Sequence, residues 1–257
     1  MSTTRQRAWT DEPSHGRALS PATALRHTLL WASRRHQIRT VVVAAPVTRS
    51  LVRRFVAGES VEDAVRGTRE LAAGGLHISL DHLGEDTRDA TDAVAAVDAY
   101  RTLVQRLAEE GLSAQAEVSV KLSALGQAID ESLALDNARR ICAAARDAGT
   151  TVTVDMEDHT TTDATLRAVA ALRADFPSTG AVLQASLHRS AEDCRELAAP
   201  GSRVRLCKGA YQEPAAVAWQ QPGEVRSAFL RCLRTLALGR AHAMVATHDP
   251  HLITAAG

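Results

Sequence analysis

The strongest constraint on the fold is a regular alternation of short apolar runs with longer segments of helical periodicity. Between the runs, apolar residues recur at helical spacing, as in the segment 94–107. Strands separated by helices pair in parallel through right-handed crossovers, and continuous apolar strands are typical of sheets buried on both faces. The pattern therefore predicts an α/β protein with six candidate strands, at 76–80, 116–122, 151–155, 181–185, 203–206 and 243–247.

The length of 257 residues suits a single (βα)8-type (TIM-like) barrel, of which about six strands are present. Residues 1–20 mix Ser, Thr, Pro and Gly without periodicity, so we expect a disordered lead-in. Residues 21–75 are predicted to form an N-terminal helical arm with helices at 21–36, 47–56 and 60–73. Ser60 and Asp63 are spaced as in a helix-capping box. The barrel itself is expected over residues 76–257.

Composition excludes several classes of function. Lys+Arg 30 against Asp+Glu 30 leaves no net charge, which gives no support for nucleic-acid binding. The four cysteines have no metal-ligand spacing, so we predict reduced thiols and no metal site. The apolar run 41–47 is interrupted by Pro46 and is too short to span a bilayer. These features predict a cytoplasmic protein without a signal peptide.

Polar residues gather where the predicted strands end, which is where parallel α/β proteins place their sites. Lys121 lies in an apolar run and requires an anionic partner, either a ligand or Asp155. Arg205 and Lys208 form either a salt-bridged strand end or a phosphate site. Gly209 slightly favours the interpretation as a phosphate site, because a residue without a side chain lets backbone N–H groups approach a phosphate.

Six runs in this order resemble the proline dehydrogenase family, specifically its monofunctional bacterial members. The resemblance covers roughly residues 41–251, and the RLCKGAY run is the most specific of the six. The runs are DHLGE (81–85), SVKLSALG (119–126), DMED (155–158), QASLHR (184–189), RLCKGAY (205–211) and ATHD (246–249).

The resemblance implies a flavin-dependent distorted barrel that oxidises L-proline to Δ1-pyrroline-5-carboxylate. It also implies FAD as cofactor and a quinone as electron acceptor, with peripheral contact at the inner face of the membrane. Lys121 would bind the substrate carboxylate, Asp155 would be a catalytic-site acid, and Arg205 would lie near flavin N5. The residues implied to bind FAD are Met156, Gln184, Lys208, Gly209, Ala210, Thr247 and His248. Because the substrate amine must be neutral to release a hydride, activity is expected to rise with pH.

The family pattern continues with two further βα units and a YxxRR run that supplies paired arginines for the substrate carboxylate. This sequence ends at Gly257, so we expect a C-terminally truncated barrel that lacks these units and exposes two sheet edges. A barrel open in this way is expected to fold poorly alone. Turnover is expected to be lower than in relatives, because Lys121 alone would replace three cations.

Two other hypotheses remain open. Lys121 or Lys208 would be the Schiff-base lysine of a barrel aldolase, with Asp155 as proton shuttle. Alternatively, the chain is a catalytically inactive flavin-binding barrel fragment. Borohydride trapping with a carbonyl substrate distinguishes the first hypothesis from the flavin enzyme. Yellow protein that does not bleach with proline would support the second.

Overall fold

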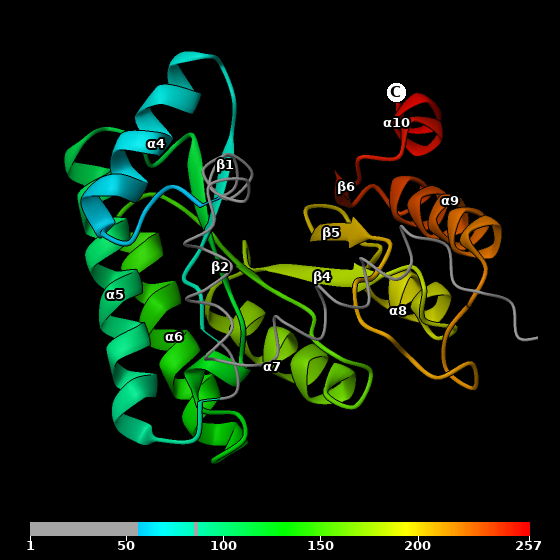
Figure 1. Cartoon of the computed structure of the whole chain (residues 1–257), viewed down its shortest axis with the longest axis horizontal. Helices are drawn as coiled ribbons and strands as arrows, with labels where there is room; N and C mark the ends of the chain where they lie inside the picture. Colours follow the sequence, from blue (N-terminus) through cyan, green and yellow to red (C-terminus); the bar gives the residue numbers. More distant parts are fainter. Residues whose placement is uncertain (1–55, 85–86) are drawn as a thin grey trace, which may run out of the picture. The chain divides into compact units, whose positions relative to one another are not determined.

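The computed structural model describes residues 56–84 and 87–257, and Ala57–Gly257 forms one compact unit. Its centre is a six-stranded sheet in which every pairing is parallel and strand order follows the sequence (Figure 1). Each predicted strand is confirmed to within two residues at either end. The strands are β1 (Ile78–Asp81), β2 (Ala116–Val120), β3 (Val152–Val154), β4 (Gly180–Gln184), β5 (Arg203–Cys207) and β6 (His242–Ala246).

A helix follows each strand, which confirms the α/β class and the barrel-type order. These helices are α5 (Ala90–Glu109), α6 (Glu131–Asp147), α7 (Thr162–Asp175), α8 (Ser190–Leu197), α9 (Pro222–Leu238) and α10 (Pro250–Ala256). A 3-10 turn, η1 (Ser123–Leu125), precedes α6. The shortest interval between predicted strand starts, from residue 181 to residue 203, accommodates only the eight residues of α8.

Of the predicted N-terminal arm, the structure describes helix α4 (Val61–Ala73). Its capping box is confirmed in both directions: Ser60 accepts from the Asp63 backbone N–H, and Asp63 accepts from that of Ser60. Helix α4 packs against α5 and β1 and belongs to the same compact unit as the sheet. The predicted lead-in, the helix at 21–36 and nearly all of the one at 47–56 lie outside the described residues.

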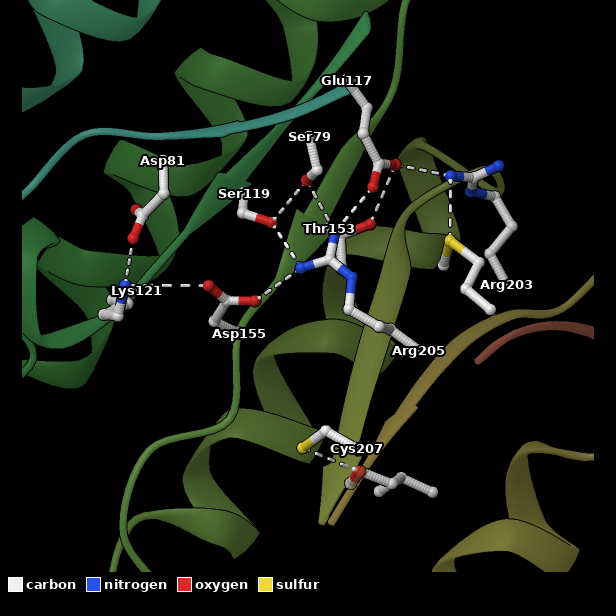
Figure 2. Close-up of polar contacts among 12 residues, drawn as sticks. Ser79, Asp81, Glu117, Ser119, Lys121, Thr153, Asp155, Arg203, Arg205 and Cys207 are labelled. Atoms are coloured by element: carbon white, nitrogen blue, oxygen red, sulfur yellow. Dashed lines mark hydrogen bonds and ion pairs between the residues drawn. The ribbon is translucent and has the colours of Figure 1, made fainter. Parts of the chain in front are cut away.

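The two faces of the sheet differ in chemistry. On one face, paired residues such as Val120 and Val154, or Leu183 and Leu206, are apolar and buried. They join the helices in two hydrophobic clusters, one centred on α5 and α6 and the other on α8 and α9. The opposite face has polar and charged side chains from β1, β2, β3 and β5, which we call the inner face (Figure 2).

The prediction of strands buried on both faces is therefore only partly right. Every residue of β3 and β4 is buried, whereas β1 and β5 alternate between more and less accessible residues. The reason is that β5 places Arg203 and Arg205 at alternate positions, so that both guanidinium groups lie on the inner face. There they meet carboxylates from neighbouring strands.

Within the described residues, β1 pairs only with β2 and β6 only with β5. Strand β6 is the more accessible of the two, because none of its residues is buried. Association of these edges with another chain stays a prediction. None of the described helices has the length and apolar character needed to span a membrane.

Candidate functional site

Arg205 is the centre of the inner-face network (Figure 2). Its Nη1 donates to Asp155 Oδ1 at 3.0 Å and to Ser119 Oγ at 2.8 Å. Its Nη2 donates to Glu117 Oε1 at 2.6 Å and to Ser79 Oγ at 2.7 Å. Because these partners come from β1, from β2 and from the residue after β3, the guanidinium is held in one orientation across the sheet.

Lys121 and Asp155 each lie one residue beyond a strand, at the carboxyl edge of the sheet. The Asp155 N–H continues the ladder by donating to the Val120 carbonyl at 2.8 Å. Lys121 Nζ lies 3.7 Å from Asp155 Oδ2 and also contacts Asp81. Of the two partners predicted for Lys121, a ligand or Asp155, the structure shows Asp155, although Asp81, the last residue of β1, makes the shorter contact.

A buried tyrosine fixes Asp81. The Tyr100 hydroxyl, from helix α5, lies 2.6 Å from the Ser119 carbonyl and 3.1 Å from Asp81 Oδ1, and it accepts from the His82 N–H at 3.0 Å. Burial, together with the Asp81 charge, raises the pKa of Tyr100, so the phenol remains a proton donor. Helix α5 therefore orders the ends of β1 and β2.

Asp155 has a perturbed carboxyl group. Burial raises its pKa, whereas the charges of Arg205 and Lys121 lower it, and the net direction is upward. An elevated carboxyl pKa arises when the low-dielectric surroundings oppose ionisation more than neighbouring cations favour it. Asp155 thus holds a proton more readily than an exposed aspartate does, as expected of a functional acid.

The ends of β3, β4 and β5 form a second part of the same edge. Met156 and Gln184 are buried, and the Gln184 amide donates to the Glu157 carbonyl at 2.7 Å. Gly209 has φ +107°, and a Cβ there would lie 2.2 Å from Ser186 Oγ. Only glycine fits this backbone without displacing Ser186. The turn therefore brings unshielded backbone close to the end of β4.

Lys208 borders an open depression of about 670 Å³ at the end of β6. Its Nζ lies 3.3 Å from Asp249 Oδ2, and Arg226 Nε lies 3.7 Å from the same oxygen. Thr247 and His248 line the depression with them. Two cations that share one carboxylate leave a positive excess, which suits an anion such as a phosphate.

The structure thus places the predicted residues in two groups. Lys121, Asp155 and Arg205 join one network, and Lys208, Thr247 and His248 line one depression. Gln184 lies near Gly209, whose ideal Cβ position is 3.4 Å from Gln184 Oε1. Ala210 follows Gly209 and is exposed. Apart from Arg205, which is the central residue of β5, the predicted residues lie at or just beyond the carboxyl ends of parallel strands.

Sequence reasoning included Asp81 in the DHLGE run without assigning it a role, and it missed Glu117 and Tyr100 as members of the site. A signal for Glu117 existed, because a glutamate between apolar residues in a parallel strand predicts a paired charge. The signal for Tyr100 was weaker, since an aromatic residue in an amphipathic helix is usually part of the core.

A parallel strand-helix repeat with charged residues at the carboxyl ends defines the barrel-type class of α/β proteins, whose sites lie at that edge. A family model described as Proline dehydrogenase matches residues 64–256. "Proline dehydrogenase 1" of Bacillus subtilis strain 168 is 35% identical over 229 residues, covering 89% of this chain and 75% of that protein. "Proline dehydrogenase" of Deinococcus radiodurans is 37% identical over 209 residues, covering 79% of this chain and 67% of that protein. The chain belongs to the proline dehydrogenase family, a family of oxidoreductases.

Solved structures agree on the fold. Proline utilization A (PutA) from Bdellovibrio bacteriovorus, inactivated by N-propargylglycine, matches with TM-score 0.72 at 23% identity over 80% of this chain. A mutant PutA from Bradyrhizobium japonicum matches with TM-score 0.64 at 24% identity over 79% of this chain. The chain spans only about a quarter of either structure, 26% and 24% respectively.

Proposed function

We propose that this chain is an FAD-dependent proline dehydrogenase that oxidises L-proline to Δ1-pyrroline-5-carboxylate. The observation that carries the proposal is that Lys121, Asp155 and Arg205 meet in one ion network at the carboxyl edge of the sheet. Family membership supports the same reaction. In that reaction a hydride leaves the ring carbon next to nitrogen, the nitrogen loses a proton, and a C=N bond forms.

Lys121 is proposed to bind the substrate carboxylate. Its side chain is 16% exposed at the edge of the sheet and already lies between two carboxylates, Asp81 and Asp155. An ammonium group held in this way is preorganised to donate to a further carboxylate oxygen. Protonation of Asp155, whose pKa is raised, would remove one negative charge beside Lys121. The charge of Lys121 would then be available to the substrate carboxylate.

The described residues fit FAD. The depression beside Lys208 and Arg226 offers cations for a diphosphate, and Gly209 offers backbone without a side chain. FAD, when bound, supplies the two-electron acceptor for the hydride. Arg205 would contribute positive charge near flavin N5, stabilising the negative charge that develops on reduction. The residues proposed to hold FAD are Met156, Gln184, Lys208, Gly209, Ala210, Thr247 and His248.

A quinone is proposed as the final electron acceptor, reached through peripheral contact with the membrane. This part of the proposal follows from the resemblance of the six strand-end runs to the family. The two electrons and protons released from proline balance the reduction of one quinone to its quinol.

The aldolase hypothesis has less support. A Schiff-base lysine attacks as the neutral amine. Lys121 instead lies against Asp81 and Asp155, and Lys208 lies 3.3 Å from Asp249. Both lysines are therefore engaged in ion pairs with carboxylates in the structure.

Product detection tests the proposal. FAD-loaded protein is incubated with L-proline and a soluble quinone, and the cyclic imine is trapped with o-aminobenzaldehyde as a coloured adduct. D-Proline and the Lys121→Met variant serve as controls, and both should give little colour. Protein that binds FAD but forms no imine from L-proline would support the inactive flavin-binding alternative instead.

A further inference from the structure

We propose that Glu117 is a positioning residue for Arg205, and that its charge limits how strongly the site attracts negative charge. This inference rests on the proposed function, because it concerns the charge that a bound flavin would meet. No family motif named above contains Glu117, which lies within β2, two positions before Ser119.

Glu117 bridges two arginines of the same strand (Figure 2). Its Oε1 accepts from Arg205 Nη2 at 2.6 Å, and its Oε2 accepts from Arg203 Nη2 at 2.5 Å. The Thr153 hydroxyl donates to the same Oε2 at 3.1 Å. The Glu117 side chain is only 14% exposed, so both ion pairs are shielded from solvent. Shielding makes the charge of Glu117 effective on its neighbours.

The inner-face network is electrically balanced. The carboxylates Asp81, Glu117 and Asp155 face the cations Lys121, Arg203 and Arg205. Two of these carboxylates contact Lys121 at the edge of the sheet, where substrate would bind. Glu117 instead lies between the two arginines, deeper in the sheet. Loss of its charge would therefore leave one positive charge in excess on the arginine side.

The bridge also sets the orientation of Arg205. Glu117 and Ser79 hold Nη2, whereas Asp155 and Ser119 hold Nη1. Glutamine at position 117 retains an oxygen that can accept from Arg205 but carries no charge. A Glu117→Gln variant therefore separates the charge of Glu117 from its hydrogen bond.

Sulfite affinity is the readout that distinguishes this role from a purely structural one. Sulfite adds to oxidised flavin and bleaches its absorbance, and positive charge near the flavin favours the addition. We expect Glu117→Gln to bind sulfite about tenfold more tightly than the parent protein, because a shielded unit charge is lost nearby. Arg203→Met removes charge of the opposite sign and should weaken sulfite binding by a similar factor.

Two further variants complete the design. The double variant Glu117→Gln with Arg203→Met restores the charge balance and should return sulfite affinity to within about threefold of the parent. Glu131→Gln removes one negative charge from an exposed pair with Arg167 and is the matched control. It should leave sulfite affinity unchanged. The Arg203→Met arm still tests the inference if Glu117→Gln does not fold.

The outcomes are distinct. Opposite shifts in the two single variants, cancelled in the double variant, support the inference. Equal sulfite affinity in all flavin-loaded variants, or weaker binding in Glu117→Gln, overturns it and leaves the proposed function intact. Protein that takes up no flavin contradicts the proposed function, and the inference falls with it.

Discussion

The two faces of the sheet show how one strand serves two purposes. In β5, Val204 and Leu206 point to the helices and are fully buried among apolar side chains. Arg203 and Arg205 alternate with them and lie on the inner face among carboxylates. Apolar burial stabilises the fold, whereas buried ion pairs contribute little because desolvation offsets their attraction. The helix-covered face therefore supplies most of the stability, and the inner face holds the charged residues of the candidate site.

The largest effect on stability is expected on the helix-covered face. Phe229 of α9 is fully buried in the second hydrophobic cluster. Phe229→Ala should lower the free energy of unfolding by about 3–5 kcal/mol, through lost burial and the cavity that remains. Urea denaturation followed by circular dichroism measures it. Leu238→Ala, at a side chain 75% exposed, is the control, and a similar loss there would contradict the assignment.

On the inner face, the largest effect should be on the affinity for the substrate. Lys121→Met removes the proposed carboxylate-binding charge, and one charge-assisted hydrogen bond corresponds to about 10- to 100-fold in affinity. We expect the concentration of L-proline needed for half-maximal flavin reduction to rise by that factor. The free energy of unfolding should change less in Lys121→Met than in Phe229→Ala. Unaltered proline dependence would show that Lys121 has only a structural role.

Gly209 lies two residues beyond the end of β5, at the carboxyl edge of the sheet. Gly209→Ala would place a Cβ 2.2 Å from Ser186 Oγ at a positive φ, so we expect a loss of about 1–3 kcal/mol in unfolding free energy. Adding Ser186→Gly should recover part of that loss. Gly223→Ala, with no neighbouring atom within 4 Å of the added Cβ, is the control and should be close to neutral. Equal stability of Gly209→Ala and Gly223→Ala would refute the steric argument.

The smallest expected effect is a pH dependence from Asp155. Its pKa is raised above the ordinary 3.8, mainly by burial, so the folded protein binds this proton more tightly than the unfolded chain. The Asp155 proton therefore contributes to the free energy of unfolding below pH 3.8, and this contribution declines as pH rises through the raised pKa. The parent protein should therefore lose stability relative to Asp155→Asn as pH increases from 3.8 through the raised pKa. Urea unfolding across that range measures the difference, and a constant difference would mean that Asp155 ionises normally.

The fold was predictable from sequence because strand runs and helical spacing depend on local periodicity. The Ser60 capping box was predicted from the spacing of one side-chain pair. Residues at strand ends, such as Lys121 and Asp155, were also found, because parallel strands end at a common edge. Glu117 was not predicted, because its partners Arg203 and Arg205 lie 86 and 88 residues away. The sequence alone does not show that β2 and β5 bring these side chains together.

Anaerobic titration of FAD-loaded protein with L-proline tests the central claim most directly. If the ion network and the depression beside Lys208 serve one flavin and one substrate, the yellow absorbance should disappear in proportion to added proline. Arg205→Met should retain the yellow colour at the same proline concentrations. Protein that binds FAD but keeps its full absorbance in excess L-proline would contradict the assignment of substrate and cofactor to this edge of the sheet.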